Sequence, residues 1–267
     1  MTDIGRGAGP DFIEALARGL DVLRSFRSGT PAMTLSELAS LTGLARPTVR
    51  RILITLEQLG YVRADGRGYA LTPRVLELGM AYVHSLNMWD VARPHMERLV
   101  AQTNESSSMA QLDGSDIVYV ARVAVPKIVT LGVSIGTRFP APPTSMGKVL
   151  LAALPPADLA GTLAEPSRSG ITPRWQPSAA ELGTALREVR AKGWALADQD
   201  LAPGIRSVAT GVRDGEGRVI AAVNVTVHAA ETSVETLLED HLPRLLRTAA
   251  DISHDWALTA HIPAVTV

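Results

Sequence analysis

One stretch, TLSELASLTGLARPTVRRILITLEQLGYVR at residues 34–63, constrains the fold of this chain more than any other. Thr34 and Glu37 fit a capping box, which predicts a short helix that begins there. Gly43 then breaks the helix, and Pro47 fits the first turn of a second helix, where its missing N–H costs nothing. The spacing therefore predicts two helices joined by a tight turn.

The second of these helices has two different faces. Its apolar positions recur at helical spacing and are expected to face a core: Val49, Ile52, Leu53, Leu56 and Leu59. The opposite face carries Arg46, Thr48, Arg50 and Arg51. Arginines on an amphipathic helix are usually only a solvated face. A basic helix N-terminus after a tight turn is, however, also the geometry that enters a DNA major groove.

A hairpin signal follows directly and favours the second interpretation. Residues 61–63 and 69–71 are strand-like and flank Ala64-Asp65-Gly66-Arg67-Gly68, a turn sequence. A hairpin after such a helix makes a wing, on which Arg63 and Arg67 can reach phosphates or the minor groove. The order of helix, turn, basic helix and basic wing predicts a winged helix-turn-helix that binds double-stranded DNA.

The charge distribution supports a DNA-binding N-terminal part that is joined to a different, acidic part. Residues 11–75 carry nine arginines against six acids, although the whole chain has a net charge of −1, so the remaining residues are acidic. The chain has no cysteine, which excludes a disulfide scaffold and a thiolate metal site. Its N-terminus is unlike a signal peptide, and no run approaches the ~18–20 apolar residues of a membrane span. We expect a cytoplasmic protein with no membrane partner.

The periodicity predicts five segments along the chain. They are a tail (1–10), the winged helix-turn-helix domain (11–72), a linker helix (73–90), a larger second domain (91–257) and a C-terminal tail (258–267). A first amphipathic helix at 11–27 completes the three-helix core of the DNA-binding domain. The linker helix is more apolar than a small wing domain needs, so we expect it to pack against a partner chain as well.

Beyond the linker the pattern changes to α+β. Strand-like runs occupy 107–112, 117–125, 128–133, 194–197, 207–212 and 219–227. Helical patterns occupy about 90–103, 145–154, 156–164, 179–192 and 233–256. A mixed sheet flanked by helices is a common small-molecule-binding architecture.

Motifs for catalysis are missing from this part. The six histidines show no metal-ligand spacing, and no G-x-S-x-G elbow surrounds Ser145 or Ser207. Ser145-Met146-Gly147-Lys148 is similar to the end of a P-loop, but Pro142 and Val149 break that pattern. We expect no enzyme activity, no cofactor and no metal. The same segment can bind an anion at a helix N-terminus; an ordinary capped helix is the alternative.

Six collinear segments together resemble the IclR family of bacterial transcriptional regulators. They are ARGLDVLRSF (17–26), LSELASLTGLARPTVRRILITLEQLGYV (35–62), LTPRVLELG (71–79), IGTRFPAPPTSMGKVLLA (135–152), DQDLAPGIRSVA (198–209) and AAVNV (221–225). The stretches LTPRVLELGMAYVHSL, ESSSMAQLDGSDIVYVARV and GTRFPAPPTSMG look most like the branch that controls aromatic-acid breakdown through the β-ketoadipate pathway.

The resemblance implies a winged helix-turn-helix, a linker helix and a GAF-like effector-binding domain with a mixed or antiparallel sheet. It also implies a homodimer formed through the N-terminal region, or a tetramer that is a dimer of dimers. Carried over by position, the DNA-reading residues become Arg46, Pro47, Thr48, Arg50 and Arg51, with wing support from Arg63 and Arg67.

The resemblance to this branch also implies a small carboxylate as effector, either an aromatic acid or a β-ketoadipate-like diacid. The family's effector pocket maps onto Ile128, Leu131, Phe139, Ser145, Met146, Asp198, Asp200, Ser207, Asn224 and Thr226. These residues combine apolar walls with a few polar groups, as small-molecule pockets do. Arg138 can form a bidentate pair with a second carboxylate of the effector. The alternative is that Arg138 is a surface arginine that binds no ligand.

Two other functions stay open at this point. The chain can be a small-molecule-binding signalling protein whose winged helix contacts another protein rather than DNA. An enzyme of unrecognised chemistry comes third, because no motif supports it.

Overall fold

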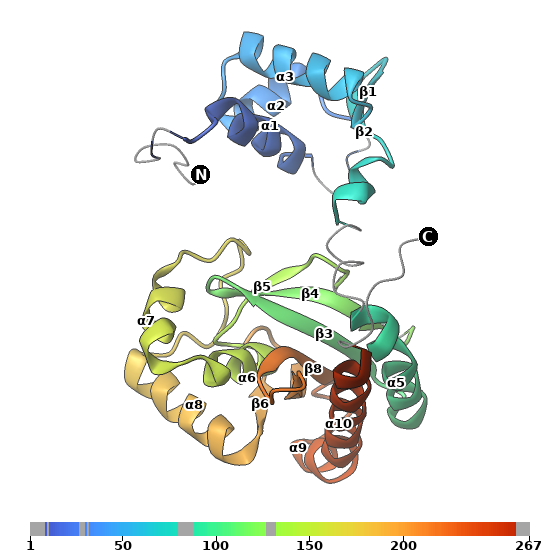
Figure 1. Ribbon diagram of the computed structural model, residues 1–267, viewed down its shortest axis with the longest axis vertical. Coiled ribbons are helices and arrows are strands. Elements are labelled where there is room, and N and C mark those ends of the chain that lie inside the picture. Colours follow the sequence, from blue (N-terminus) through green and yellow to red (C-terminus); the bar gives the residue numbers. More distant parts are fainter. Residues whose placement is uncertain are drawn as a thin grey trace. The chain divides into compact units, whose positions relative to one another are not determined.

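The computed structural model describes residue 9 and residues 11–26, 30, 32–79, 88–126 and 132–259. The chain divides into two compact units, Met1–Ser85 and Leu86–Val267 (Figure 1). Each unit has its own buried apolar residues, so each is described by itself. In the part of the chain described, no helix combines the length and the apolar character that a bilayer crossing requires.

The first unit is a three-helix bundle with a two-stranded wing. Its elements are α1 (Glu14–Arg24), α2 (Leu35–Thr42), α3 (Arg46–Gln58), β1 (Val62–Asp65) and β2 (Gly68–Leu71). The core lies between the helices and contains Val22, Leu38, Val49 and Leu53, all fully buried. Residues 75–79 form a further helical segment. The predicted winged helix-turn-helix is thereby confirmed.

Local chemistry explains why α2 and α3 meet at a sharp turn. The Thr34 side chain accepts a hydrogen bond from the Glu37 N–H at 3.2 Å, and the Glu37 carboxylate accepts one from the Thr34 N–H at 2.8 Å. Gly43 ends α2 with a φ of 70°, a left-handed conformation that glycine adopts without strain. Pro47 lies in the first turn of α3, as its fixed φ favours.

The wing is tied to the start of α2. Met33 and Tyr69 form an antiparallel bridge with two backbone hydrogen bonds of 2.8 Å each. Gly68, at the start of β2, makes this approach possible. A Cβ atom there would lie 2.4 Å from the Met33 carbonyl oxygen, which is far below contact distance. Only glycine therefore fits at this position without moving the wing.

The second unit is built on a six-stranded sheet in the order β5-β4-β3-β8-β7-β6. The strands are β3 (Ser106–Asp113), β4 (Asp116–Val123), β5 (Arg138–Pro140), β6 (Trp194–Asp198), β7 (Ile205–Arg213) and β8 (Val219–His228). Every pairing in the sheet is antiparallel, which decides between the mixed and the antiparallel sheet left open by the sequence.

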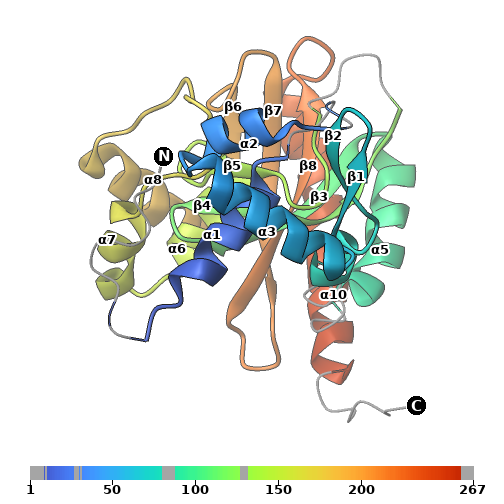
Figure 2. The same cartoon turned by 90° about the horizontal axis from the view of Figure 1, so that it is seen from above.

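Helices cover both faces of this sheet (Figures 1 and 2). They are α5 (Met88–Thr103), α6 (Ser145–Ala153), α7 (Pro156–Ala164), α8 (Ala179–Lys192), α9 (Val234–Thr236), the π-helical turn η1 (Leu237–His241) and α10 (Leu242–Thr259). One core packs α5 and α10 on the sheet, and a second core packs α6 and α8 on the opposite face. The sheet is thus buried on both sides, which explains why β8, with the sequence VIAAVNVTVH, is apolar at most positions on both faces.

Some sequence-based expectations fall outside what is described. The expected strand at 128–133 overlaps residues 127–131, which are not described, and residues 132 and 133 are not in a strand. The expected linker helix is helical at 75–79, and its continuation over 80–87 is likewise outside the described residues. The short strand β5 was not predicted, since three residues are too few to show a period.

The wing contact predicts a clear difference between two glycines. Replacing Gly68 by alanine should destabilise the first unit by about 1–3 kcal/mol, because the new methyl group collides with backbone. Gly66→Ala is the matched control, since nothing lies within 4 Å of a Cβ atom there. Hydrogen exchange at the Met33 and Tyr69 amides measures the effect. Equal protection in the two variants would contradict this explanation.

Candidate functional site

The outer face of α3 presents a row of cations. Val49 and Leu53 are fully buried against α1 and α2, which turns Arg46, Arg50 and Arg51 to solvent. Pro47, also expected to read DNA, is exposed on the same first turn, and Thr48 is half-buried. The amphipathic pattern therefore places the predicted basic surface on the outside of the bundle.

The guanidinium groups of this surface are free to bind a ligand. Within the described residues, no hydrogen bond or ion pair engages the guanidinium groups of Arg46, Arg50 and Arg51 on α3. The same holds for Arg63 and Arg67 on the wing, which are exposed as well. Unpaired, exposed arginines on a recognition-type helix and its wing suit phosphates and base edges.

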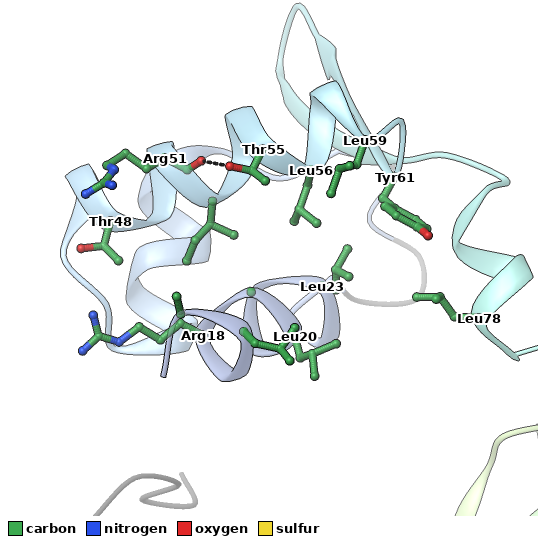
Figure 3. A pocket seen from close by; sticks show the side chains of 14 residues that line it. Arg18, Leu20, Leu23, Thr48, Arg51, Thr55, Leu56, Leu59, Tyr61 and Leu78 are labelled. Carbon is green, nitrogen blue, oxygen red and sulfur yellow. Dashed lines mark hydrogen bonds between the residues drawn. The ribbon is translucent and has the colours of Figure 1, made fainter. Parts of the chain in front are cut away.

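A second surface of the first unit is apolar. A groove of about 610 Å³ runs between α1 and α3, from Thr48 and Arg51 to Tyr61 and Leu78 (Figure 3), so it borders the basic surface. Leu16 and Leu78 expose 61% and 51% of their surface there, which is unusual for leucine. A contiguous exposed apolar surface of this kind typically marks a protein contact.

The second unit contains a small internal cavity between the sheet and the start of α6. Its volume is about 30 Å³, enough for a water molecule or two. Its lining is Tyr119, Arg122, Val133, Pro143, Thr144, Ser145, Met146, Ala197, Asp200, Leu201, Ile205, Ser207, Asn224 and Thr226. Apolar walls with a few polar groups make this cavity the candidate ligand site.

The start of α6 supplies one polar end of the cavity. Thr144 caps the helix by accepting a hydrogen bond from the Gly147 N–H at 3.0 Å. Ser145, in the first turn, shares a hydrogen bond of 2.7 Å with the Ser207 hydroxyl on β7. A Cβ atom on Gly147 would lie 2.0 Å from the Ala141 carbonyl oxygen, so glycine lets α6 approach the preceding loop. The loop and the helix together fix the two hydroxyl groups.

Asn224 on β8 lies in the wall of the cavity that the sheet forms, and it links neighbouring residues of that wall by hydrogen bonds. Its side-chain oxygen accepts a hydrogen bond from the Ser108 N–H at 2.9 Å, and its side-chain nitrogen donates one to the Thr226 hydroxyl at 3.0 Å. Asn224 is 2% exposed, so this pattern determines which way its amide points. Both of its polar atoms are thus engaged within the protein.

Arg122 on β4 is the charged group that distinguishes the cavity. It is half-buried and donates a hydrogen bond of 2.9 Å to the Ser108 hydroxyl. No carboxylate among the described residues lies within ion-pair distance of its guanidinium group. Burial lowers the pKa of Arg122 from its usual value. A partly desolvated cation without a counter-ion favours the binding of an anion.

Tyr119 lies beside Arg122 and stays protonated. Burial raises the pKa of Tyr119 to about 12, although the nearby Arg122 charge acts to lower it. The Tyr119 hydroxyl is therefore available as a hydrogen-bond donor throughout the physiological pH range. It adds a second donor beside the guanidinium group.

The acidic residue in the lining already has a counter-ion. Asp200 accepts a hydrogen bond of 2.6 Å from Lys148 on α6, whose ammonium group also donates to the Leu196 carbonyl oxygen at 3.0 Å. The same ammonium group lies 4.5 Å from the centre of the Trp175 ring. Asp200 thus does not neutralise Arg122, and the cavity keeps its preference for an anion.

The structure brings together six of the residues predicted for the effector pocket: Ser145, Met146, Asp200, Ser207, Asn224 and Thr226. Ile128 and Leu131 are outside the described residues. Tyr119 and Arg122 were not predicted. A sequence signal for Arg122 exists, because a charged residue interrupts the apolar strand IVYVARV.

Three predicted pocket residues lie outside the lining of the cavity and have partners of their own. Arg138 forms an ion pair with Asp113. Asp198 accepts a hydrogen bond of 2.8 Å from Arg206. Phe139 is 4% exposed and packs edge-on against the Tyr119 ring, with 5.6 Å between the ring centres.

No metal site competes with this interpretation among the residues that the structure describes. No group of three or more histidine, aspartate or glutamate side chains comes together there in a way that could hold an ion.

Comparison with protein families covers both units. The model described as IclR helix-turn-helix domain matches residues 15–66. The model described as Bacterial transcriptional regulator IclR C-terminal matches residues 80–254. The two matches follow one another along the chain and include the arginines of α3, Arg63 of the wing and the whole cavity lining.

Individual relatives are similar over nearly their full length. The Pca regulon regulatory protein of Pseudomonas putida is 39% identical over 92% of this chain and 84% of its own. The p-hydroxybenzoate hydroxylase transcriptional activator of Acinetobacter baylyi is 30% identical over 91% of each chain. A solved structure, an IclR homolog from Microbacterium hydrocarbonoxydans complexed with 4-hydroxybenzoate, has a TM-score of 0.77 and 25% identity over 91% of this chain and 99% of its own.

Proposed function

This chain belongs to the IclR family of bacterial transcriptional regulators, and we propose that an aromatic carboxylate in the second unit controls its binding to operator DNA. Genes of aromatic-acid breakdown are its targets, as the similarity to the Pca regulon regulator and the p-hydroxybenzoate hydroxylase activator supports. Because its target is chromosomal DNA, the protein works in the bacterial cytoplasm.

The observation that carries the choice of effector is the unpaired Arg122 guanidinium in the cavity. A carboxylate there forms a charge-assisted, bidentate pair and removes the cost of a desolvated cation. The hydroxyl groups of Ser145 and Ser207, at the start of α6, suit a ring hydroxyl at the other end of the effector. A hydroxybenzoate combines both groups, and 4-hydroxybenzoate is the ligand of the Microbacterium structure.

Effector binding requires the cavity to grow. A space of about 30 Å³ holds a water molecule or two but not an aromatic ring. The lining must therefore adopt a second, wider arrangement, and the effector favours it only as far as its affinity differs between the two arrangements. This difference in binding free energy sets the upper limit of the change in DNA affinity that the effector can cause.

DNA binding is assigned to α3 and the wing. Arg46, Arg50 and Arg51, with Pro47 and Thr48, form the surface that enters the major groove, and the wing arginines contact the backbone. We place the DNA-binding domain at residues 11–72, the linker at 73–90 and the effector-binding domain at 91–257. The free guanidinium groups support this assignment.

The functional form is a homodimer, in which the two copies contact each other through the apolar groove of the first unit. The operator is pseudo-palindromic, and each copy binds one half-site. The groove exposes Leu20, Leu59 and Leu78 (Figure 3). Leu16 is exposed in the same groove, and a second copy would bury all four leucines. A tetramer, as a dimer of two such dimers, is the larger assembly.

Replacing Arg50 or Arg51 by alanine should weaken operator binding by roughly 1–3 kcal/mol, because each variant loses the contact between a guanidinium group and a base. Electrophoretic mobility shifts at fixed salt, with a DNA fragment selected by the wild-type protein, measure this. Arg187→Ala, an exposed arginine on α8, is the control and should bind normally. Wild-type affinity in both α3 variants would exclude this surface as the DNA-reading one.

Arg122→Met should weaken 4-hydroxybenzoate binding by about tenfold to a hundredfold, since a hydrogen-bonded ion pair contributes about 1.5–3 kcal/mol. Calorimetric titration of the full-length protein gives the affinity, and a mobility shift shows that DNA binding is kept. Arg138→Met, which removes the arginine expected to meet a second carboxylate, should leave the affinity for this monocarboxylate unchanged. The reverse pattern in the two variants would move the carboxylate away from Arg122.

Glutamate in place of Leu16 should shift the protein from dimer to monomer and reduce operator affinity, because it puts a charge into the groove. Ile171→Glu, at an exposed isoleucine of the second unit, is the control. Sedimentation velocity at micromolar concentration distinguishes the two. A Leu16→Glu protein that stays dimeric would place the dimer contact elsewhere.

A further inference from the structure

A separate cleft lies between α5 and α10, on the face of the sheet opposite to α6. The two helices run antiparallel and side by side (Figures 1 and 2). His95 Nε2 lies 2.8 Å from Asp255 Oδ2 near one end, and Arg244 donates to the Gln102 carbonyl oxygen at 3.3 Å near the other. Between these contacts the helices leave a space of about 110 Å³.

The charge around this cleft is unbalanced. Three arginines line it, Arg98 from α5 and Arg244 and Arg247 from α10, against one carboxylate, Asp251. In the described part of the chain, no carboxylate lies within ion-pair distance of any of these three guanidinium groups. Three cations held close together repel one another, so this arrangement favours a bound anion.

Two of the three arginines are held in position by groups that leave their charge uncompensated. Arg98 donates to His95 Nδ1 at 2.6 Å, while His95 Nε2 faces the Asp255 carboxylate. This geometry assigns the imidazole proton to Nε2. Arg244 is held by a neutral carbonyl oxygen. Arg247 has no partner among the described residues and remains free for a ligand.

A hydroxyl group also belongs to the lining of this cleft. Thr248 on α10 is 9% exposed and lines the same cleft. No hydrogen bond engages its hydroxyl within the described residues. The Thr248 hydroxyl can therefore donate a further hydrogen bond to an anion that the arginines hold.

We propose that this cleft is a second ligand site of the protein, which binds a phosphate group. Three positive charges against one negative match a dianion, and guanidinium forks fit its oxygens bidentately. A cleft of about 110 Å³ has room for one such group but not for a peptide segment. The source is free phosphate or the phosphate ester of a metabolite. The site is distinct from the cavity around Arg122 and does not rest on the function proposed for it.

Calorimetric titration of the full-length protein tests this, in phosphate-free buffer at ionic strength held constant with sodium chloride. The probes are inorganic phosphate and glycerol 3-phosphate. Each should bind, and Arg247→Gln or Arg98→Gln should weaken binding by roughly tenfold or more. Arg247→Lys, which keeps the charge but loses the fork, should fall between. Arg93→Gln, on α5 but outside the cleft, is the matched control and should bind like the wild type.

Tighter binding of the ester would identify a metabolite as the source, and tighter binding of inorganic phosphate would identify the free ion. Absence of binding by both probes would overturn the proposal. So would equal affinity in the wild type and in Arg247→Gln. Because Arg247 is exposed and unpartnered, its replacement leaves the fold intact, which a melting curve verifies. Binding of 4-hydroxybenzoate by Arg247→Gln with wild-type affinity would show that the cleft is a site separate from the cavity around Arg122.

Discussion

The ligand site of the second unit depends on one electrostatic constraint: the Arg122 guanidinium group lines a cavity, and no carboxylate of the described residues forms an ion pair with it. Arg122 is held by the Ser108 hydroxyl, beside a tyrosine whose buried hydroxyl stays protonated. Asp200, the acid in the lining, is already paired with Lys148. A protein bears the cost of a desolvated cation when a ligand supplies the opposite charge, and this links the cavity to anionic effectors. It is also why the cavity, rather than the larger grooves, is the place to look for the effector.

The first unit could be predicted in detail because its signals are local. A capping box at Thr34, a left-handed glycine at position 43 and a proline in the first turn of α3 each act within a few residues. The helical spacing of apolar residues then decides which face of α3 is buried and which carries the arginines. The close approach of Gly68 to Met33 could not be predicted, since it joins two segments that no periodicity relates.

The cavity was less predictable because a β-bulge builds it. Tyr119 and Arg122 are three residues apart, so a regular strand would turn them to opposite faces. The pairing of β4 with β3 shifts between Met109 and Ala110, leaving Val120 without a partner, and both side chains then line the same cavity. The sequence instead indicates Arg138 as a partner for a carboxylate, because its ion pair with Asp113 cannot be predicted from the chain. The polar groups on α6, β7 and β8 were found through family resemblance, not through spacing.

The most direct test of this account is a crystal structure of the full-length protein with 4-hydroxybenzoate. We expect the ligand carboxylate about 3 Å from the Arg122 guanidinium nitrogens, in a cavity larger than that of the free protein. Its ring hydroxyl should lie against Ser145 and Ser207. A ligand bound elsewhere, with no anion at Arg122, would show that Arg122 does not bind the effector.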